Sequence, residues 1–85
     1  MASDDEIRKA ILRKMLRGEF IGAKHTSIEN VPKGFPKSER GNVKKVAEKL
    51  VKEGYFICKP KPDALHVSLN PKMLPQIVRE IESEE

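Results

Sequence analysis

The sequence predicts one α+β domain, mainly helical, and three observations support this prediction. Apolar residues recur at helical spacing in three segments, they alternate with polar residues in a fourth, and glycine or proline stands between these segments. A chain of 85 residues builds one small core. Neither an internal repeat nor a change in composition divides it, so residues 1–85 are expected to form a single domain with short acidic ends.

The first helix is predicted over residues 4–17. Ser3 and Glu6 have the spacing of a capping box, in which each side chain accepts from the other residue's backbone amide. Gly18 is expected to end the helix in the left-handed conformation. Residues 19–22 are expected to form a short extended piece. One face of the helix is marked by Ile7, Ala10, Ile11, Lys14 and Met15, and Leu12 and Leu16 widen it.

Residues 22–41, GAKHTSIENVPKGFPKSERG, lie between two helical patterns. Thr26 and Glu29 have the spacing of a second capping box, which predicts a short helix from Ser27. This helix is expected to be brief because a proline follows Val31 and disfavours the helical conformation there. A turn over residues 33–36 then leads to the next helix. The segment is expected to be anchored to the core by Ile28, Val31 and Phe35.

The longest helical pattern covers residues 38–53, and Gly54 is expected to end it. Its inward face is formed by Val43, Val46, Ala47, Leu50 and Val51. Two β-prone runs, 55–58 and 65–69, flank a proline-containing polar turn and predict an antiparallel hairpin. Asn70 is expected to cap a turn, and the last helix is expected to begin near Pro75. Its apolar stripe is formed by Leu74, Ile77, Val78 and Ile81.

A short helix joined by a glycine-containing turn to a longer helix, with a hairpin after it, resembles the winged helix-turn-helix fold. The order is helix, short strand, helix, helix, β-hairpin, helix. Residues 22–71 also resemble a group of small, largely uncharacterised archaeal proteins. The shared blocks are Gly22-Ala-Lys-His-Thr26, Lys33-Gly-Phe-Pro36, Arg40-Gly41 and His66-Val-Ser-Leu-Asn-Pro71. The resemblance implies the fold but does not select a function, because winged helices serve DNA, RNA and protein binding alike.

Charge favours nucleic acid among these partners. All 17 lysines and arginines lie between Arg8 and Arg79, where the chain carries a net charge of +11, whereas seven acids lie at the ends. By helix-turn-helix geometry the start of helix 38–53 meets base edges and its flanks meet phosphates. The expected base readers are Ser38, Gly41, Asn42 and Lys45, and the expected phosphate contacts are Lys37, Arg40, Lys44 and Lys49. Further candidates are Lys59 and Lys61 in the hairpin, and Lys24 and Thr26 before the short helix.

The sequence does not favour catalysis or a cofactor. His25, Cys58 and His66 are the soft or imidazole ligands, and none is paired at helical spacing, so no metal site is expected. Motifs typical of phosphate loops and nucleophile elbows are absent from the sequence. With one cysteine, an acidic start and no apolar run near the roughly 20 residues that span a bilayer, we expect a cytoplasmic protein that is not in a membrane.

We therefore expect a non-enzymatic protein that binds duplex DNA, as a transcription regulator or a chromatin-associated factor. Helix 4–17 and the last helix each carry an apolar face that could serve a homodimer, which is a further option. Two alternatives stay open: a protein-interaction module of a larger transcription or RNA-processing complex, and an RNA-binding protein. The few aromatic residues look structural, which disfavours the base stacking by which single-stranded RNA is bound.

Overall fold

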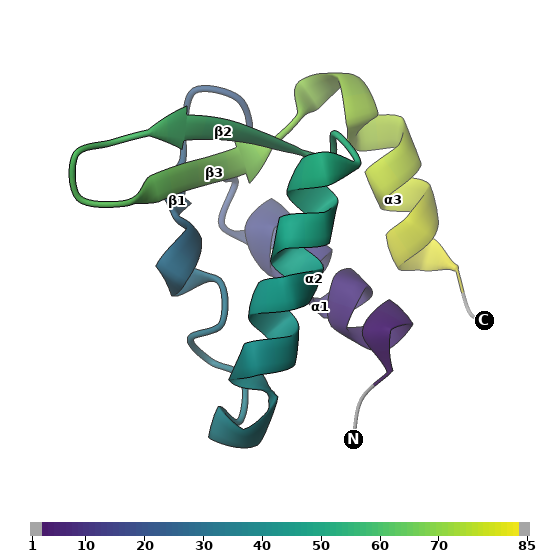
Figure 1. Ribbon diagram of the computed structural model, residues 1–85. Coiled ribbons are helices and arrows are strands. Elements are labelled where there is room, and N and C mark those ends of the chain that lie inside the picture. The colour runs from purple at the N-terminus through teal and green to yellow at the C-terminus, as the bar shows by residue number, and fades with distance from the viewer. Residues whose placement is uncertain (1–2, 84–85) are drawn as a thin grey trace.

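The computed structural model describes residues 3–83, and within them it has three α-helices and one three-stranded antiparallel sheet. The predicted class, α+β and mainly helical, is confirmed. Figure 1 shows the hairpin extending to one side of the molecule and the last helix lying on the other side. In chain order the elements are α1 (Asp4–Arg17), β1 (Thr26–Ser27), α2 (Arg40–Lys52), β2 (Phe56–Pro60), β3 (Leu65–Leu69) and α3 (Leu74–Glu82).

Helix α1 has the predicted bounds and the predicted cap. The Ser3 hydroxyl accepts from the amide of Glu6, and the Glu6 carboxylate accepts from the amide of Ser3. The prediction of a left-handed Gly18 is wrong: its φ is −81°, and Glu19 with a φ of 59° takes that conformation. The glycine is needed for space, because a Cβ at position 18 would lie 2.5 Å from a ring carbon of Phe20.

The segment between α1 and α2 contains less helix than predicted. Thr26 and Ser27 form strand β1, and one 3-10 turn, Ile28–Asn30, follows. The hydroxyl of Ser27 caps that turn, so the predicted capping box of Thr26 and Glu29 is wrong. Val31 has a helical φ and ψ despite the proline after it, and its side chain is fully buried. Burial of this valine therefore outweighs the local preference.

Helix α2 is preceded by a 3-10 turn, Lys37–Glu39, so the predicted helix 38–53 is regular only over residues 40–52. The helix ends at Gly54, as predicted, and this glycine has a φ of +84°. The inward face is confirmed for Val43, Val46, Ala47 and Leu50, which are all buried, whereas Val51 at its edge is half-buried.

The sheet has the order β1-β3-β2. β2 and β3 form the predicted hairpin, although β2 runs two residues further than predicted, to Pro60. The predicted extended piece at residues 19–22 is displaced: the regular strand is β1, while Ile21 makes a single bridge to Leu69. One face of the hairpin enters the core through Phe56, Val67 and Leu69.

The opposite, outer face of the hairpin is partly covered by residues 20–25. Leu69 donates its amide to the carbonyl of Phe20 and accepts from the amide of Gly22. The Ser68 hydroxyl, which is fully buried, donates to the Gly22 carbonyl at 2.8 Å. These bonds fix the segment before β1 against the sheet.

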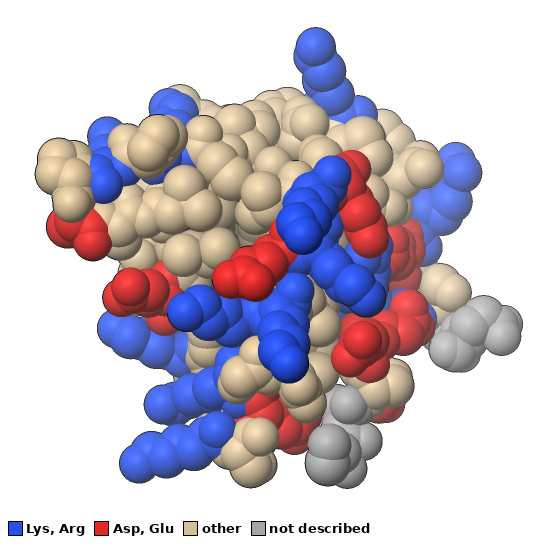
Figure 2. Space-filling view, viewed as in Figure 1, with Lys and Arg blue, Asp and Glu red and all other residues tan. Residues whose placement is uncertain are grey.

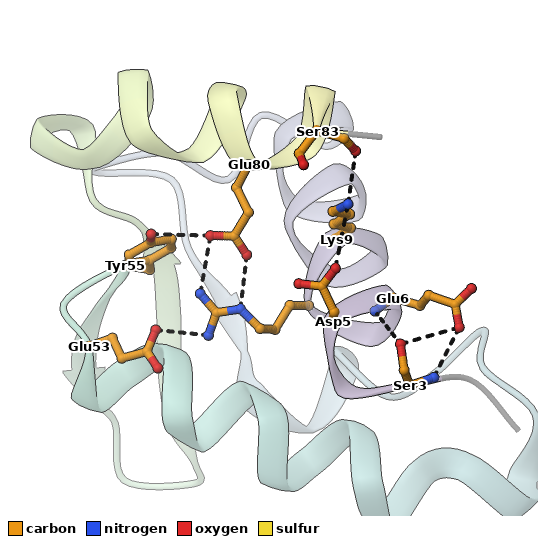
Figure 3. Close-up of polar contacts among 9 residues, drawn as sticks. Ser3, Asp5, Glu6, Lys9, Glu53, Tyr55, Glu80 and Ser83 are labelled. Atoms are coloured by element: carbon orange, nitrogen blue, oxygen red, sulfur yellow. Dashed lines mark hydrogen bonds and ion pairs between the residues drawn. The ribbon is translucent and has the colours of Figure 1, made fainter. Parts of the chain in front are cut away.

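Helix α3 is fastened by charged groups as well as by apolar contacts. Arg8 Nε donates to Glu80 Oε2 at 2.9 Å, and Arg8 Nη1 donates to Glu53 at 2.8 Å. Figure 3 shows Tyr55 and Glu53 converging with Glu80 at this junction. Lys9 Nζ donates to the carbonyl of Ser83 at 2.8 Å. The network joins α1, α3 and the end of α2.

The two helices expected to support a homodimer differ in what they leave exposed. The apolar face of α1 lies in the core of its own chain, with Ile7, Ile11, Leu12 and Met15 buried. On α3, Ile77 is buried and Val78 is 38% exposed.

Candidate nucleic-acid interface

The surface of α2 is set by the burial of its apolar side. Because that side faces the core, the opposite side is exposed and carries Gly41, Lys45, Glu48, Lys49 and Lys52. Ser38 lies in the preceding 3-10 turn and is also exposed, whereas Asn42 is half-buried. Of the four predicted base readers, Gly41, Asn42 and Lys45 thus lie in the first half of α2, and Ser38 lies in the turn before it.

The predicted phosphate contacts of this region, Lys37, Arg40, Lys44 and Lys49, are all exposed. Figure 2 shows lysine and arginine side chains gathered over α2 and below it on this face. Within residues 3–83 the ion pairs engage only Arg8 and Lys9 among the basic residues. The cations on α2 are therefore available to an external anion.

Arg40 has a structural bond as well. Its Nε donates to the carbonyl of Phe35 at 3.1 Å, which ties the start of α2 to the turn before it. A guanidinium has five N–H donors, so the remaining groups can still meet a phosphate. The bond to Phe35 therefore holds the guanidinium near the start of α2 and leaves its other N–H groups for a ligand.

A groove runs along one side of α2. One hollow, of about 340 Å³, lies at the helix start, and a second, of about 300 Å³, continues toward the helix end. Both are lined by Ile28 and Lys44. The floor is largely apolar, with Pro32, Val51 and Leu65, and the charged rim consists of Arg40, Lys44, Lys52, Glu29 and Glu48.

The turn that aims α2 is held by Lys14 of α1. Its ammonium donates to the carbonyls of Asn30 at 2.9 Å, of Val31 at 3.1 Å, and of Lys33. Burial, with a smaller effect of the nearby Lys33 charge, lowers the pKa of Lys14. A lysine that the sequence pattern places on the apolar face of a helix thus binds the backbone of a segment 16 to 19 residues away.

The hairpin candidates lie apart from the exposed face of α2. Lys59 is opposite His66 in the strand register, on the outer face of the sheet, and Lys61 begins the loop that joins the strands. Both are exposed. Since the core side of this sheet carries Val67 and Leu69, the outer face points away from the core. The predicted site residues therefore divide between two surfaces.

Lys24 and Thr26 differ in their freedom to bind a ligand. The Thr26 hydroxyl accepts from the side-chain amide of Asn30 at 3.0 Å, and the residue is half-buried in β1. This bond ties Thr26 to the 3-10 turn that follows β1. The Lys24 ammonium is exposed and lies 5.2 Å from the ring centroid of Phe20.

Sequence reasoning missed a contact between the two histidines. His25 Nδ1 and His66 Nδ1 lie 2.8 Å apart, and the rings meet edge to face. Partial burial and then the charges of His66, Lys61 and Lys59 lower the pKa of His25. No local spacing signals this pair, because 41 residues separate its members and the sheet brings them together.

Cys58 does not join the histidines. It is opposite Val67 in the register and so lies on the core side of the sheet, where burial raises the pKa of its thiol. Within residues 3–83 no three His, Cys, Asp or Glu side chains gather as a metal site would require. In the same range no helix is long and apolar enough to cross a bilayer.

Comparison with models of protein families, with curated proteins and with solved structures finds no match to this chain. The candidate function therefore rests on the geometry and charge of the surfaces described above.

Proposed function

We propose that this protein binds duplex DNA without catalysing a reaction, as a transcription regulator or a chromatin-associated factor. The observation that carries the proposal is the exposed, basic side of α2, whose lysines make no ion pair within residues 3–83. Residues 33–52 hold seven basic and two acidic side chains. Such a strip matches the phosphate backbone, which supplies most of the sequence-independent affinity for DNA.

The order of elements supports a winged-helix arrangement for this purpose. The long helix α2 is followed directly by the hairpin of β2 and β3. Strand β1, which precedes α2 in the chain, pairs with β3 and makes the hairpin a three-stranded sheet. The arrangement departs from a full helix-turn-helix in one respect: the helix before the turn is the single 3-10 turn Ile28–Asn30. In this proposal Lys14 compensates by holding the carbonyls of that segment.

In the proposed complex α2 enters the major groove with its N-terminal end. Asn42 is the side chain suited to bond adenine N6 and N7 together, and Lys45 suits guanine. Arg40, Lys44 and Lys49 meet phosphates on the groove edges. Gly41 has no side chain, so the α2 backbone can come close to the DNA there. The fold itself does not require the glycine, because a Cβ at this position would have no neighbour within 4 Å in the free protein. The hairpin serves as the wing, with Lys61 in its loop.

The test is a salt titration of binding to a random-sequence duplex. We expect affinity to fall steeply with salt, and Lys45→Glu to weaken binding by placing a carboxylate in the groove. Lys49→Glu, at a proposed phosphate contact, should reduce the magnitude of the salt slope by about 1. Arg79→Glu is the matched control, because it makes the same charge change at an exposed position on α3, across the molecule from the hairpin. Full affinity in Lys45→Glu would exclude this placement of α2, and no binding at low salt would exclude the function.

A second candidate function is docking of a protein partner, which the groove beside α2 favours. Its floor is apolar, and the three cations on its rim outnumber the two carboxylates there, which suits an amphipathic segment with acidic residues. Leu65, 37% exposed, borders this groove. Amide shifts confined to the groove on addition of an acidic amphipathic peptide, together with no binding of duplex, would select this function over the first.

A further inference from the structure

The exposed side of α2 carries one acidic residue, Glu48, among its basic ones. Glu48 lies two positions before Leu50, which is fully buried, so at about 100° per residue the two side chains leave the helix about 160° apart. Gly41, Lys45 and Lys52 share this outward side with Glu48. The carboxylate therefore lies in the middle of the surface that is proposed to face DNA.

Glu48 is surrounded by lysines, yet it is paired with none of them. Lys44, Lys45 and Lys52 are three or four residues away, which is the spacing at which side chains on one helix meet. None of these lysines takes part in an ion pair within residues 3–83. Figure 2 shows acidic side chains exposed between basic ones over α2. The carboxylate is therefore open to a donor from outside the protein.

On a surface that binds DNA, a carboxylate has a cost. It repels the phosphates and so lowers the affinity for every duplex. Such a repulsive group improves discrimination when one partner offsets the repulsion and the others do not. That partner must offer a hydrogen-bond donor, because a carboxylate accepts hydrogen bonds and does not donate them.

Among the bases, cytosine meets this requirement best. In the major groove cytosine presents the N4 amino donor, guanine and thymine present acceptors, and adenine has the N7 acceptor beside its donor. The O6 and N7 acceptors of the paired guanine suit an ammonium group. Lys45 precedes Glu48 by about 4.5 Å along the helix axis, close to the roughly 3.4 Å between base pairs. The two side chains are thus spaced to read the same base pair or neighbouring ones.

We propose that Glu48 is a specificity-determining residue, which accepts a hydrogen bond from the N4 amino group of a cytosine in the major groove. Lys45 reads a guanine in the same or the adjacent base pair. None of the base readers predicted from the sequence is acidic. The inference rests on the proposed function, because it requires α2 to lie in the groove.

The experiment is selection from a pool of random-sequence duplexes, with sequencing of the bound fraction. The wild-type protein should enrich cytosine at one position, and replacing that C·G pair by T·A should weaken binding about tenfold. In Glu48→Ala the same replacement should weaken binding less than about twofold, with the preferences at other positions kept. Glu48→Gln should favour adenine there, because glutamine bonds adenine N6 and N7 together. Both variants should bind a random duplex more tightly than the wild-type protein, because one repulsive charge is removed.

The matched control is Glu29→Gln. Glu29 is exposed and lines the groove beside α2, but it belongs to the 3-10 turn Ile28–Asn30. Its substitution removes the same charge and should leave the preference for cytosine unchanged. Lys45→Ala should lose a preference for guanine within about two base pairs of that cytosine, since the two side chains lie one helical turn apart.

An unchanged preference for cytosine in Glu48→Ala would overturn the inference, and so would a wild-type protein that binds duplex without any such preference. In both cases the binding of duplex would still support the proposed function. Failure of every one of these proteins to bind duplex at low salt would overturn the proposed function, and the inference with it. An unchanged amide spectrum away from position 48 would show that the variants keep the fold.

Discussion

The network around Arg8 predicts that Glu80→Gln loosens α3. Glu80 accepts two bonds from Arg8, at 2.9 and 3.2 Å, and one from the Tyr55 hydroxyl at 3.2 Å. The side chains of Arg8 and Glu80 are 17% and 20% exposed, so water screens the pair only in part. Glutamine keeps one acceptor oxygen and has no charge, and its NH₂ group faces an Arg8 donor.

The expected cost follows from the number of bonds lost. A hydrogen bond to a charged group contributes about 1.5–3 kcal/mol, and the substitution removes one and weakens the others. We expect a loss of about 2–3 kcal/mol, from a total stability of about 4–13 kcal/mol for a domain of this size. Urea denaturation at neutral pH measures the difference.

The same substitution predicts a dependence on pH. The bonds from Arg8 lower the pKa of Glu80 against the opposing effect of burial. The contribution of this carboxylate is therefore full above the ordinary glutamate pKa of about 4.3, and it is lost as pH falls through the lowered value of the folded state. The wild-type protein should approach the stability of Glu80→Gln as the solution is acidified.

The control is Glu82→Gln, which changes an exposed carboxylate two residues further along α3. It should cost much less than Glu80→Gln. If the two variants cost the same, or if the difference between the wild-type protein and Glu80→Gln does not shrink in acid, the network does not fasten α3.

Three further substitutions test the packing, each by urea denaturation. Gly18→Ala should cost about 1–3 kcal/mol, because its Cβ would lie 2.5 and 2.8 Å from two ring carbons of Phe20; unchanged stability would mean that the ring moves freely. Gly41→Ala should stabilise by up to about 1 kcal/mol, since a Cβ there has no neighbour within 4 Å; destabilisation would contradict the open position. Leu50→Ala should cost about 2–5 kcal/mol because Leu50 is fully buried, and a cost below 1 kcal/mol would place it outside the core.

Local patterns were enough to predict the regular elements. The bounds of α1, its capping box, the buried face of α2, the end of that helix at Gly54 and the antiparallel hairpin all follow from patterns along the chain. The exposed side of α2 follows too, since a helix with one buried face must present the other. The helical features depend on neighbours within about four residues, and the hairpin pairs residues no more than 13 positions apart, so the signals for both lie close together in the sequence.

Between α1 and α2 the local signals were misleading. Thr26 and Glu29 have capping-box spacing, yet pairing with β3 draws Thr26 and Ser27 into a strand. The proline after Val31 disfavours helical geometry there, yet burial of the valine imposes it. A cap or a steric preference is worth about 1 kcal/mol, and strand pairing together with apolar burial exceeds this.

By itself, then, the sequence determined the class of the fold, its three helices and its hairpin, and the basic character of α2. Only the tertiary structure decided which side chains meet across the chain. Lys14 binds the carbonyls before α2, Arg8 joins Glu53 to Glu80, and His25 meets His66. These partners are 16 to 72 residues apart, so the contacts exist only once the core has fixed the positions of the elements that carry them.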